Sequence, residues 1–222
     1  QAIEVNNKQL FTMGVASIQP WINTGNADFP FEPVSNTFIQ MGCAAKFSIA
    51  TMDNTIYWVG SNDQGEGQVW KLRGYTPTRV STHSIETRIA TSTDITDIVG
   101  YAYQQEGHTF YVISSTSGNW TLAYDVASGL WHERAFRNTS TGVFERHKGQ
   151  CYCFFNNHHV IGDYVTGEIY TFNLDVYADD GDPLRWLRTW RALPPGQNDL
   201  RKVAFHRLQI DLEAGVGLAT GQ

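Results

Sequence analysis

Short apolar runs separated by polar turns recur along the whole chain. Aromatic and β-branched residues dominate these runs, as in residues 55–59 and 108–113, and such runs predict β-strands. Ser-Gly, Lys-Gly and Thr-Gly dipeptides separate several of them and predict hairpin turns, because glycine adopts a positive φ without steric cost. No stretch shows a convincing amphipathic period of 3.6 residues, so we expect an all-β chain.

The runs form three copies of one four-stranded pattern. The first copy occupies residues 46–81, the second and most regular copy occupies 97–136, and the third begins at Val143 and ends with a strand at 184–192. Four strands per unit and a spacing of roughly 40 to 55 residues are typical of β-propeller blades. A single twisted sheet buries neither face, so we expect aromatic side chains to fill the space between successive blades.

This pattern predicts one propeller-like domain over residues 1–222. The expected divisions are a partial blade and loop at 1–45, blade units at 46–96, 97–142 and 143–192, and a closing or linking strand at 193–222. Three blades do not close a ring, so residues 3–21 are expected to join a further blade, either completed by a strand at 203–212 or left incomplete. Residues 23–37 contain two prolines and no period, which predicts a loop.

Composition narrows the class of protein. The 222 residues are 41% hydrophobic and 13% aromatic, which suffices for a core, and the start at Gln1 suggests a piece of a longer chain. The net charge of −6 argues against a dedicated nucleic-acid binder, so any such contact is expected to be local. No apolar stretch is long enough to span a bilayer, and no signal peptide is evident, so we expect no membrane contact.

Cys43, Cys151 and Cys153 form an odd set that predicts buried free thiols and folding in a reducing cytoplasm.

Four segments carry a family resemblance. They are residues 79–86 (RVSTHSIE), 103–113 (YQQEGHTFYVI), 122–134 (LAYDVASGLWHER) and 162–170 (GDYVTGEIY). They lie within residues 71–191, the stretch that the resemblance covers, and they resemble a family of packaged-DNA-stabilisation or tail-accessory proteins of short-tailed phages. The resemblance implies a propeller-like hub in the virion tail or neck, arranged as a six-fold ring below the portal and closing the DNA channel. The implied partners are further copies of the chain, portal and tail proteins, and packaged DNA without sequence preference.

A basic segment near the C-terminus is the best candidate for a functional surface. Residues 183–210 contain six cations and one acid, Asp199, which gives a local charge of +5 in an acidic chain. The cations are Arg185, Arg188, Arg191, Arg201, Lys202 and Arg207. Exposed arginines contact DNA phosphates without reading bases, or bind the acidic face of a neighbouring subunit, or are simply solvated. All three interpretations remain open from the sequence.

Other clusters point less clearly to chemistry. The acidic loop from Asp175 to Asp182 offers oxygen ligands for Ca²⁺ but lacks EF-hand spacing, so a solvated turn is favoured. His158 and His159 lie near Cys151 and Cys153 in sequence, but adjacent histidines in a strand point in opposite directions, which disfavours zinc. No nucleophile motif, phosphate loop or dinucleotide fingerprint occurs, so we expect no enzyme activity and no cofactor or metal.

A glycan-binding or glycan-processing propeller is the alternative function. Its candidate residues are four tryptophans that are able to stack on sugar rings. They are Trp58, Trp70, Trp120 and Trp131. In blade strands, however, such residues are more simply packing between blades. His108 and His132 lie beside aromatic residues in strand patterns and are likewise expected to be packed or hydrogen-bonded rather than catalytic.

Overall fold

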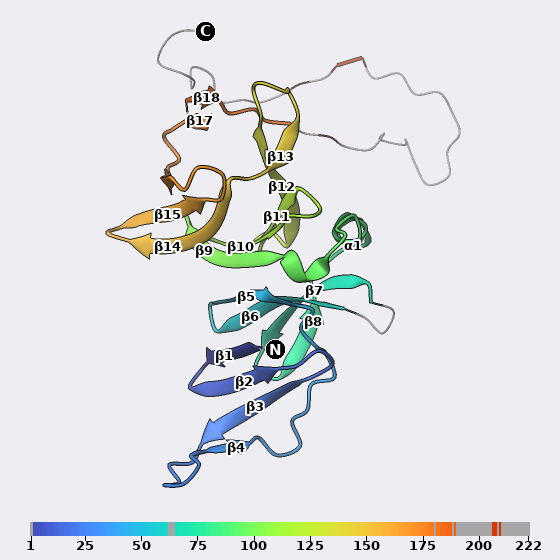
Figure 1. Ribbon diagram of the computed structural model, residues 1–222, viewed down its shortest axis with the longest axis vertical. Helices are drawn as coiled ribbons and strands as arrows, with labels where there is room; N and C mark the ends of the chain where they lie inside the picture. The colour runs from blue at the N-terminus through green and yellow to red at the C-terminus, as the bar shows by residue number, and fades with distance from the viewer. Residues whose placement is uncertain are drawn as a thin grey trace, which may run out of the picture. The chain divides into compact units, whose positions relative to one another are not determined.

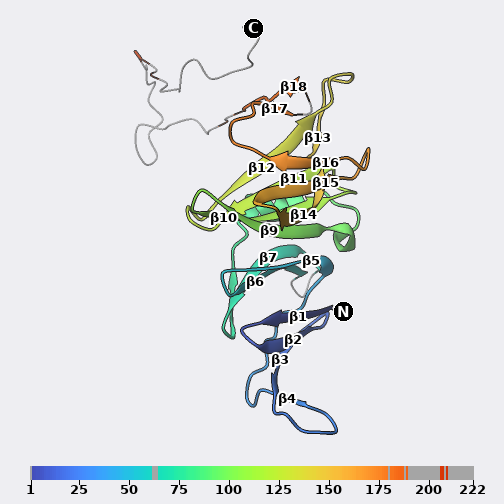
Figure 2. The ribbon, with the colours of Figure 1, turned by 90° about the vertical axis from the view of Figure 1, so that its left-hand side faces the viewer.

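The computed structural model describes residues 2–61, 65–179, 181–187, 189, 206–207 and 209. Contacts divide the chain into two compact units, Gln1–Phe172 and Asn173–Gln222, where the sequence analysis expected one domain. The first unit contains four antiparallel sheets, which follow one another in chain order (Figures 1 and 2). In the described part of the second unit, β17 (Ala178–Asp179) pairs with β18 (Asp182–Pro183).

The N-terminal residues form a four-stranded sheet. Its strands, in spatial order, are β1 (Ala2–Asn6), β2 (Gln9–Met13), β3 (Ile18–Asn23) and β4 (Phe31–Pro33). Residues 1–45 thus contain four strands where a partial blade was expected, and of the loop expected at residues 23–37 only Asn23 and residues 31–33 lie in strands. Strand β4 is a three-residue edge strand, and an edge strand tolerates proline because one side needs no backbone donor. The expected partner strand at 203–212 lies outside the described residues, apart from three isolated positions.

The second sheet matches the first copy of the sequence repeat. Its strands are β5 (Ala45–Met52), β6 (Thr55–Ser61), β7 (Gly67–Arg73) and β8 (Thr76–Arg79). The β5–β6 turn holds Asp53 and Asn54 at φ values of 50° and 56°. Two consecutive left-handed residues define a two-residue hairpin, which is why Asp-Asn occurs there.

The third sheet has one strand more than the repeat predicted. Its strands are β9 (Val99–Gln105), β10 (His108–Ser115), β11 (Trp120–Asp125), β12 (Leu130–Arg137) and β13 (Phe144–Arg146). The run at Val143 was expected to open the next sheet. Instead, Phe144 pairs with Arg137, so this run forms the last strand of the third sheet. The connection between β12 and β13 is a short hairpin, with Asn138 donating its backbone N–H to the Val143 carbonyl.

The fourth sheet contains three strands in the described part of the chain. They are β14 (Gly149–Phe155), β15 (His158–Asp163) and β16 (Ile169–Phe172). The fourth strand was expected at residues 184–192. Residues 184–187 and 189 are not in a strand, and the remainder of that range lies outside the described residues.

The four sheets pack face to face through three apolar cores. All six residues of β11 are buried, and so are the first six of β6, because these central strands are covered on both sides. In β6, Tyr57 and Val59 face the third sheet, whereas Ile56 and Trp58 face the first. The first strands of neighbouring sheets also contact one another, β1 with β5, β5 with β9, and β9 with β14. This is the arrangement of propeller blades, and the predicted all-β array of blades is confirmed.

One short helix was missed by the sequence analysis. Helix α1 (His83–Ile89) precedes a single 3-10 turn, η1 (Ile95–Asp97), and both lie between the second and third sheets in sequence. Ile85 and Ile89 are buried in the core between those sheets. Two helical turns are too short for a period of 3.6 residues to become apparent, so the pattern gave no signal.

The cysteines divide into two classes. Cys43 is buried, and burial raises the pKa of its thiol to about 11. Cys151 and Cys153 are free and exposed on β14, which corrects the expectation that they are buried. Both lie on the face of β14 opposite Tyr152, and it is Tyr152 that packs against the third sheet.

Candidate functional site

The chemistry-bearing side chains of the first unit gather between the third and fourth sheets. We call this group the aromatic seam. Its rings come from β9, β10, β14, β15 and β16, and they are Tyr101, Tyr103, Phe110, Tyr152, His159 and Phe172. Tyr103 lies at the centre, with ring centroids 5.2 Å from both Phe110 and Phe172. Alternation along each strand places these residues on facing sides of the two sheets.

One arginine enters the seam. The guanidinium carbon of Arg134 lies 5.1 Å, 5.3 Å and 5.8 Å from the ring centroids of Phe110, Tyr103 and Phe172. Its Nε donates to Nε2 of His132, 3.2 Å away. Among the described residues no carboxylate pairs with Arg134, so the aromatic faces supply its main electrostatic partners. The arginine therefore joins the two sheets through cation–π contacts.

His147 lies at the edge of this seam. Burial, together with the nearby Arg134 guanidinium, lowers the pKa of His147 from 6.5 to about 4. Its Nδ1 accepts a hydrogen bond from the Gly149 backbone N–H at 3.0 Å, which requires an unprotonated Nδ1. The imidazole is thus a neutral packing and hydrogen-bonding group at neutral pH.

Two further cations also lie over aromatic rings. The guanidinium carbon of Arg146 is 3.4 Å from the Tyr164 ring centroid, and the side chain is only 6% exposed. The ammonium of Lys148 lies 4.4 Å from the centroid of Phe136. Cations on ring faces hold elements together without requiring a partner of opposite charge. Arg134, Arg146 and Lys148 therefore form a cationic border to the aromatic seam.

The buried tyrosines of the sheets are not suited to acid–base chemistry. Burial raises the pKa of Tyr101, whose hydroxyl has no hydrogen-bond partner in the described part of the chain. Burial likewise raises the pKa of Tyr111, whose hydroxyl donates to the Ser48 carbonyl at 2.7 Å. Both phenols stay protonated at neutral pH and act as packing groups.

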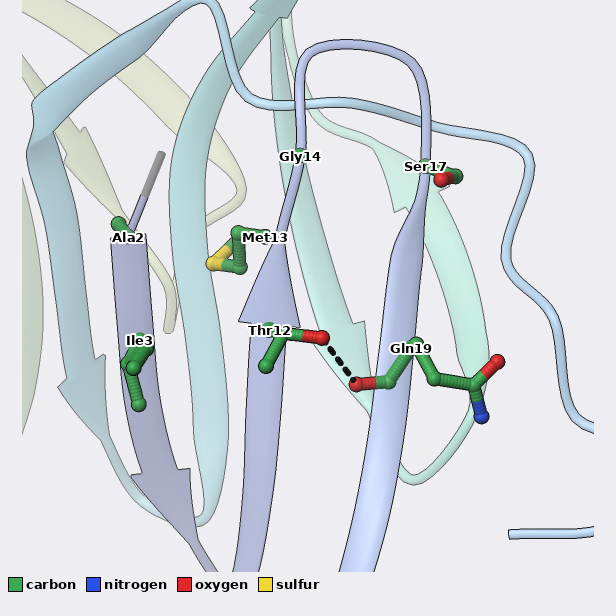
Figure 3. A pocket seen from close by; sticks show the side chains of 7 residues that line it. All are labelled: Ala2, Ile3, Thr12, Met13, Gly14, Ser17 and Gln19. Carbon is green, nitrogen blue, oxygen red and sulfur yellow. Dashed lines mark hydrogen bonds between the residues drawn. The ribbon is translucent and has the colours of Figure 1, made fainter. Parts of the chain in front are cut away.

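A cavity of about 650 Å³ lies at one end of the first sheet, beside β1, β2 and β3 (Figure 3). Its lining residues are Ala2, Ile3, Thr12, Met13, Gly14, Ser17 and Gln19. The Thr12 hydroxyl donates to the Gln19 carbonyl at 3.2 Å and accepts from the Trp21 indole N–H at 3.0 Å. The lining contains no titratable side chain, so this cavity offers shape and apolar surface rather than reactive groups.

The predicted basic segment is described only in part. Arg185 and Arg207 are exposed, in the second unit. The other four predicted cations, Arg188, Arg191, Arg201 and Lys202, lie outside the described residues. Whether the six cations share one surface therefore remains a prediction from the sequence.

The remaining sequence candidates are placed as follows. The Asp179 and Asp182 positions pair across the β17–β18 hairpin, around Gly181 at a φ of 84°. His159 Nδ1 lies 2.9 Å from the Tyr152 hydroxyl, so this histidine is engaged in the seam. His108 Nδ1 lies 2.9 Å from Asp125 Oδ2, a hydrogen-bonded pair of the kind that was expected. In the described part of the chain, no cluster of three potential metal ligands occurs.

The four tryptophans of the glycan hypothesis belong to the packing between sheets. Trp58 and Trp120 are at most 1% exposed, so neither ring is accessible to a sugar. The Trp131 indole N–H donates to the Val80 carbonyl at 2.9 Å, and Trp70 packs against the core between the first two sheets. All four tryptophans thus take part in packing, and Trp58 and Trp120 have no ring face open to a sugar.

Comparison with known proteins identifies the family. A model of a phage stabilisation family, described as "Bacteriophage P22 Gp10, beta-propeller", matches residues 1–177. The chain belongs to this family. The match includes all four sheets of the first unit, and it extends the sequence resemblance, which began at residue 71, to the N-terminus. A search of curated proteins found no match.

Family membership identifies a phage stabilisation protein built from propeller blades. The described residues contain no helix that is both long and apolar enough to cross a membrane.

Arg134 and His147, which lie at the seam, were not among the candidates from the sequence. The available signal was the alternation of His132, Arg134 and Phe136 on one face of a strand, which places a cation between aromatic side chains.

Proposed function

We propose that this chain is a non-enzymatic structural component of the phage tail or neck. It contributes to closing the DNA channel and stabilises packaged DNA through contacts with identical subunits and with portal and tail proteins. Its assembly is a ring, six-fold in the full-length protein, and its location is the virion. Membership of the phage stabilisation family supports this role.

The observation that carries the proposal is the continuous packing of four sheets. Three cores join them, and the rings and cations between the third and fourth sheets are used in packing. Such a stack is a stiff block, and a ring of subunits requires stiff blocks with fixed faces. Two of the titratable side chains nearest the seam, His147 and Tyr101, are part of this packing. We therefore assign a geometric rather than a chemical role.

Contact with DNA is assigned to the basic segment. Arg185 and Arg207 are exposed, and they belong to the stretch of residues 183–210 whose net charge is +5. Arginines at this density bind phosphates without base readout, as a conduit for packaged DNA requires. The same cations are equally suited to an acidic face on a neighbouring subunit.

Charge reversal tests this proposal in phage particles. The double variant Arg185→Glu and Arg207→Glu is expected to lower DNA retention or particle assembly, while the isolated chain stays folded. The matched control is Arg73→Glu, since Arg73 is an exposed arginine at the end of β7 in the first unit. Unchanged yield and DNA retention in the double variant would exclude these two residues from the model.

A further inference from the structure

The boundary between the third and fourth sheets is built differently from the other two. The cores between the first and second sheets and between the second and third sheets contain buried apolar side chains from both of the sheets that meet there. At the third boundary all four buried core residues belong to the third sheet, and the fourth sheet contributes the half-buried Tyr152 and Phe172. A boundary with less buried apolar surface opens at a lower free energy than a well-packed core. The fourth sheet is therefore held less firmly than the first three.

Three imidazoles lie at this same boundary. They are His132 on β12, His147 in the connection between β13 and β14, and His159 on β15. Each has its ring centroid 5.7 to 6.0 Å from that of an aromatic residue of the seam. The other described histidines of this unit are His83 and His158, which are exposed, and His108, which pairs with Asp125 within the third sheet. Histidine changes its charge near neutral pH, so a fall in pH acts on this boundary before it acts on the other two.

His147 also joins the two sheets through the chain connection. Its backbone N–H donates to the Thr121 hydroxyl of β11 at 3.1 Å, which ties the connection to the third sheet. Its ring Nδ1 accepts from the N–H of Gly149, the first residue of β14, at 3.0 Å. The ring also lies against Phe172 of β16, at a centroid distance of 6.0 Å. This one residue thus links the third sheet to two strands of the fourth.

The charged groups around His147 mostly oppose a proton on its ring. Desolvation, and after it the Arg134 guanidinium on β12, lower the pKa of His147 to about 4. The neighbouring Lys148 also lowers this pKa, whereas the Asp163 carboxylate at the end of β15 raises it. Both oxygens of that carboxylate accept hydrogen bonds within the turn that follows it, at 2.6 Å and 2.9 Å. The cations therefore have the larger effect on the imidazole.

Protonation of His147 breaks the link that its ring provides. A protonated Nδ1 donates and no longer accepts, so the Gly149 N–H loses its acceptor, and a second cation then lies near Arg134. Separation of the two sheets removes both costs, because the ring and the amide then contact water. We propose that residues 146–149 form an acid-sensitive hinge, at which protonation of His147 separates the fourth sheet from the third while the first three sheets stay packed. The hinge is a property of the first unit and does not depend on the role proposed for the chain in the particle.

Hydrogen exchange followed by mass spectrometry tests the hinge on the whole 222-residue chain. After correction for intrinsic exchange rates, the amides of β14–β16 are expected to be less protected than those of β6 and β11 at pH 7 and at pH 5. In the open state the imidazole regains its ordinary pKa of 6.5, so the open population is expected to rise about 20-fold between pH 7 and pH 5. The protection of β14–β16 is expected to fall by the same factor.

Substitution of the imidazole identifies the group responsible. His147→Asn is expected to reduce the fall in protection to less than about 3-fold, because its amide oxygen is able to accept the Gly149 N–H and does not titrate. Circular dichroism verifies folding, and His147→Gln replaces the asparagine variant if that variant fails to fold. His158→Asn is the matched control, since His158 is exposed on β15, and it is expected to keep the full fall.

Two results would overturn the proposal. One is equal protection of β14–β16 and of β6 at both pH values, which shows that the four sheets open as one unit. The other is a full fall in protection that persists in the folded His147 variant, which assigns the pH dependence to another group. Both results come from the isolated chain, so they are separable from DNA retention in particles, which tests the proposed function.

Discussion

The imidazole of His147, packed at the edge of the aromatic seam, makes the stability of this protein depend on pH between about 4 and 6.5. The pKa of His147 is lowered from 6.5 to about 4, by burial first and by the Arg134 charge second. The unfolded chain therefore binds more protons than the folded chain between these two values. Stability is full above pH 6.5 and falls as the pH decreases toward 4. Each pH unit in this window costs about 1.4 kcal/mol, so the fall from pH 7 to pH 5 is about 2 kcal/mol.

Urea unfolding at pH 7 and pH 5, followed by tryptophan fluorescence, measures this difference. His147→Asn is expected to remove most of it, because the asparagine amide oxygen is able to accept the Gly149 N–H and does not titrate. His158→Asn is the matched control, since His158 is exposed on β15, and it is expected to keep the wild-type difference. If His147→Asn retains the full loss of stability at pH 5, the assignment to this imidazole is wrong.

Two further substitutions test how the sheets are joined. Trp58→Phe is expected to lower the free energy of unfolding by about 2 to 3 kcal/mol, because it leaves the Gly42 carbonyl without its 3.0 Å indole donor and leaves space in the core between the first two sheets. The control is Leu130→Ala at an exposed site, which should change the free energy of unfolding by less than about 0.5 kcal/mol. Arg134→Met is expected to lower the free energy of unfolding, measured with urea at pH 7, by about 1 to 2 kcal/mol, because it removes the cation from three ring faces. Arg134→Lys keeps the charge and should cost less. Equal effects of the two substitutions would show that charge does not matter there.

The regular blades were predictable because their turns and central strands follow local rules. The Asp53-Asn54 turn and the aromatic and apolar residues of β11, between the turns at Gly118 and Gly129, each identify an element without any knowledge of the fold. The three-residue strand β4 and helix α1 gave no such signal, because their length is too short for a period. The sequence of β13 predicts a strand but does not say whether that strand pairs with β12 or with β14. The short hairpin after β12 decides that it joins the third sheet.

The candidate site was less predictable than the fold. The strongest signal in the sequence is a linear cluster of charge, but the seam is built from five strands and one arginine that are distant in sequence. Exposure of Cys151 and Cys153 was also not predictable, because an alternating strand is consistent with burial of either side. The partner surface alone decides which side is covered.

The most direct test of the account is quantitative mass spectrometry of purified particles of the phage that encodes the chain. The measured quantity is the molar ratio of peptides from this chain to peptides from the portal protein. A structural role in the tail or neck predicts a fixed, ring-sized copy number in every DNA-filled particle. Absence of the peptides from purified particles, or a trace amount that varies between preparations, would contradict the account.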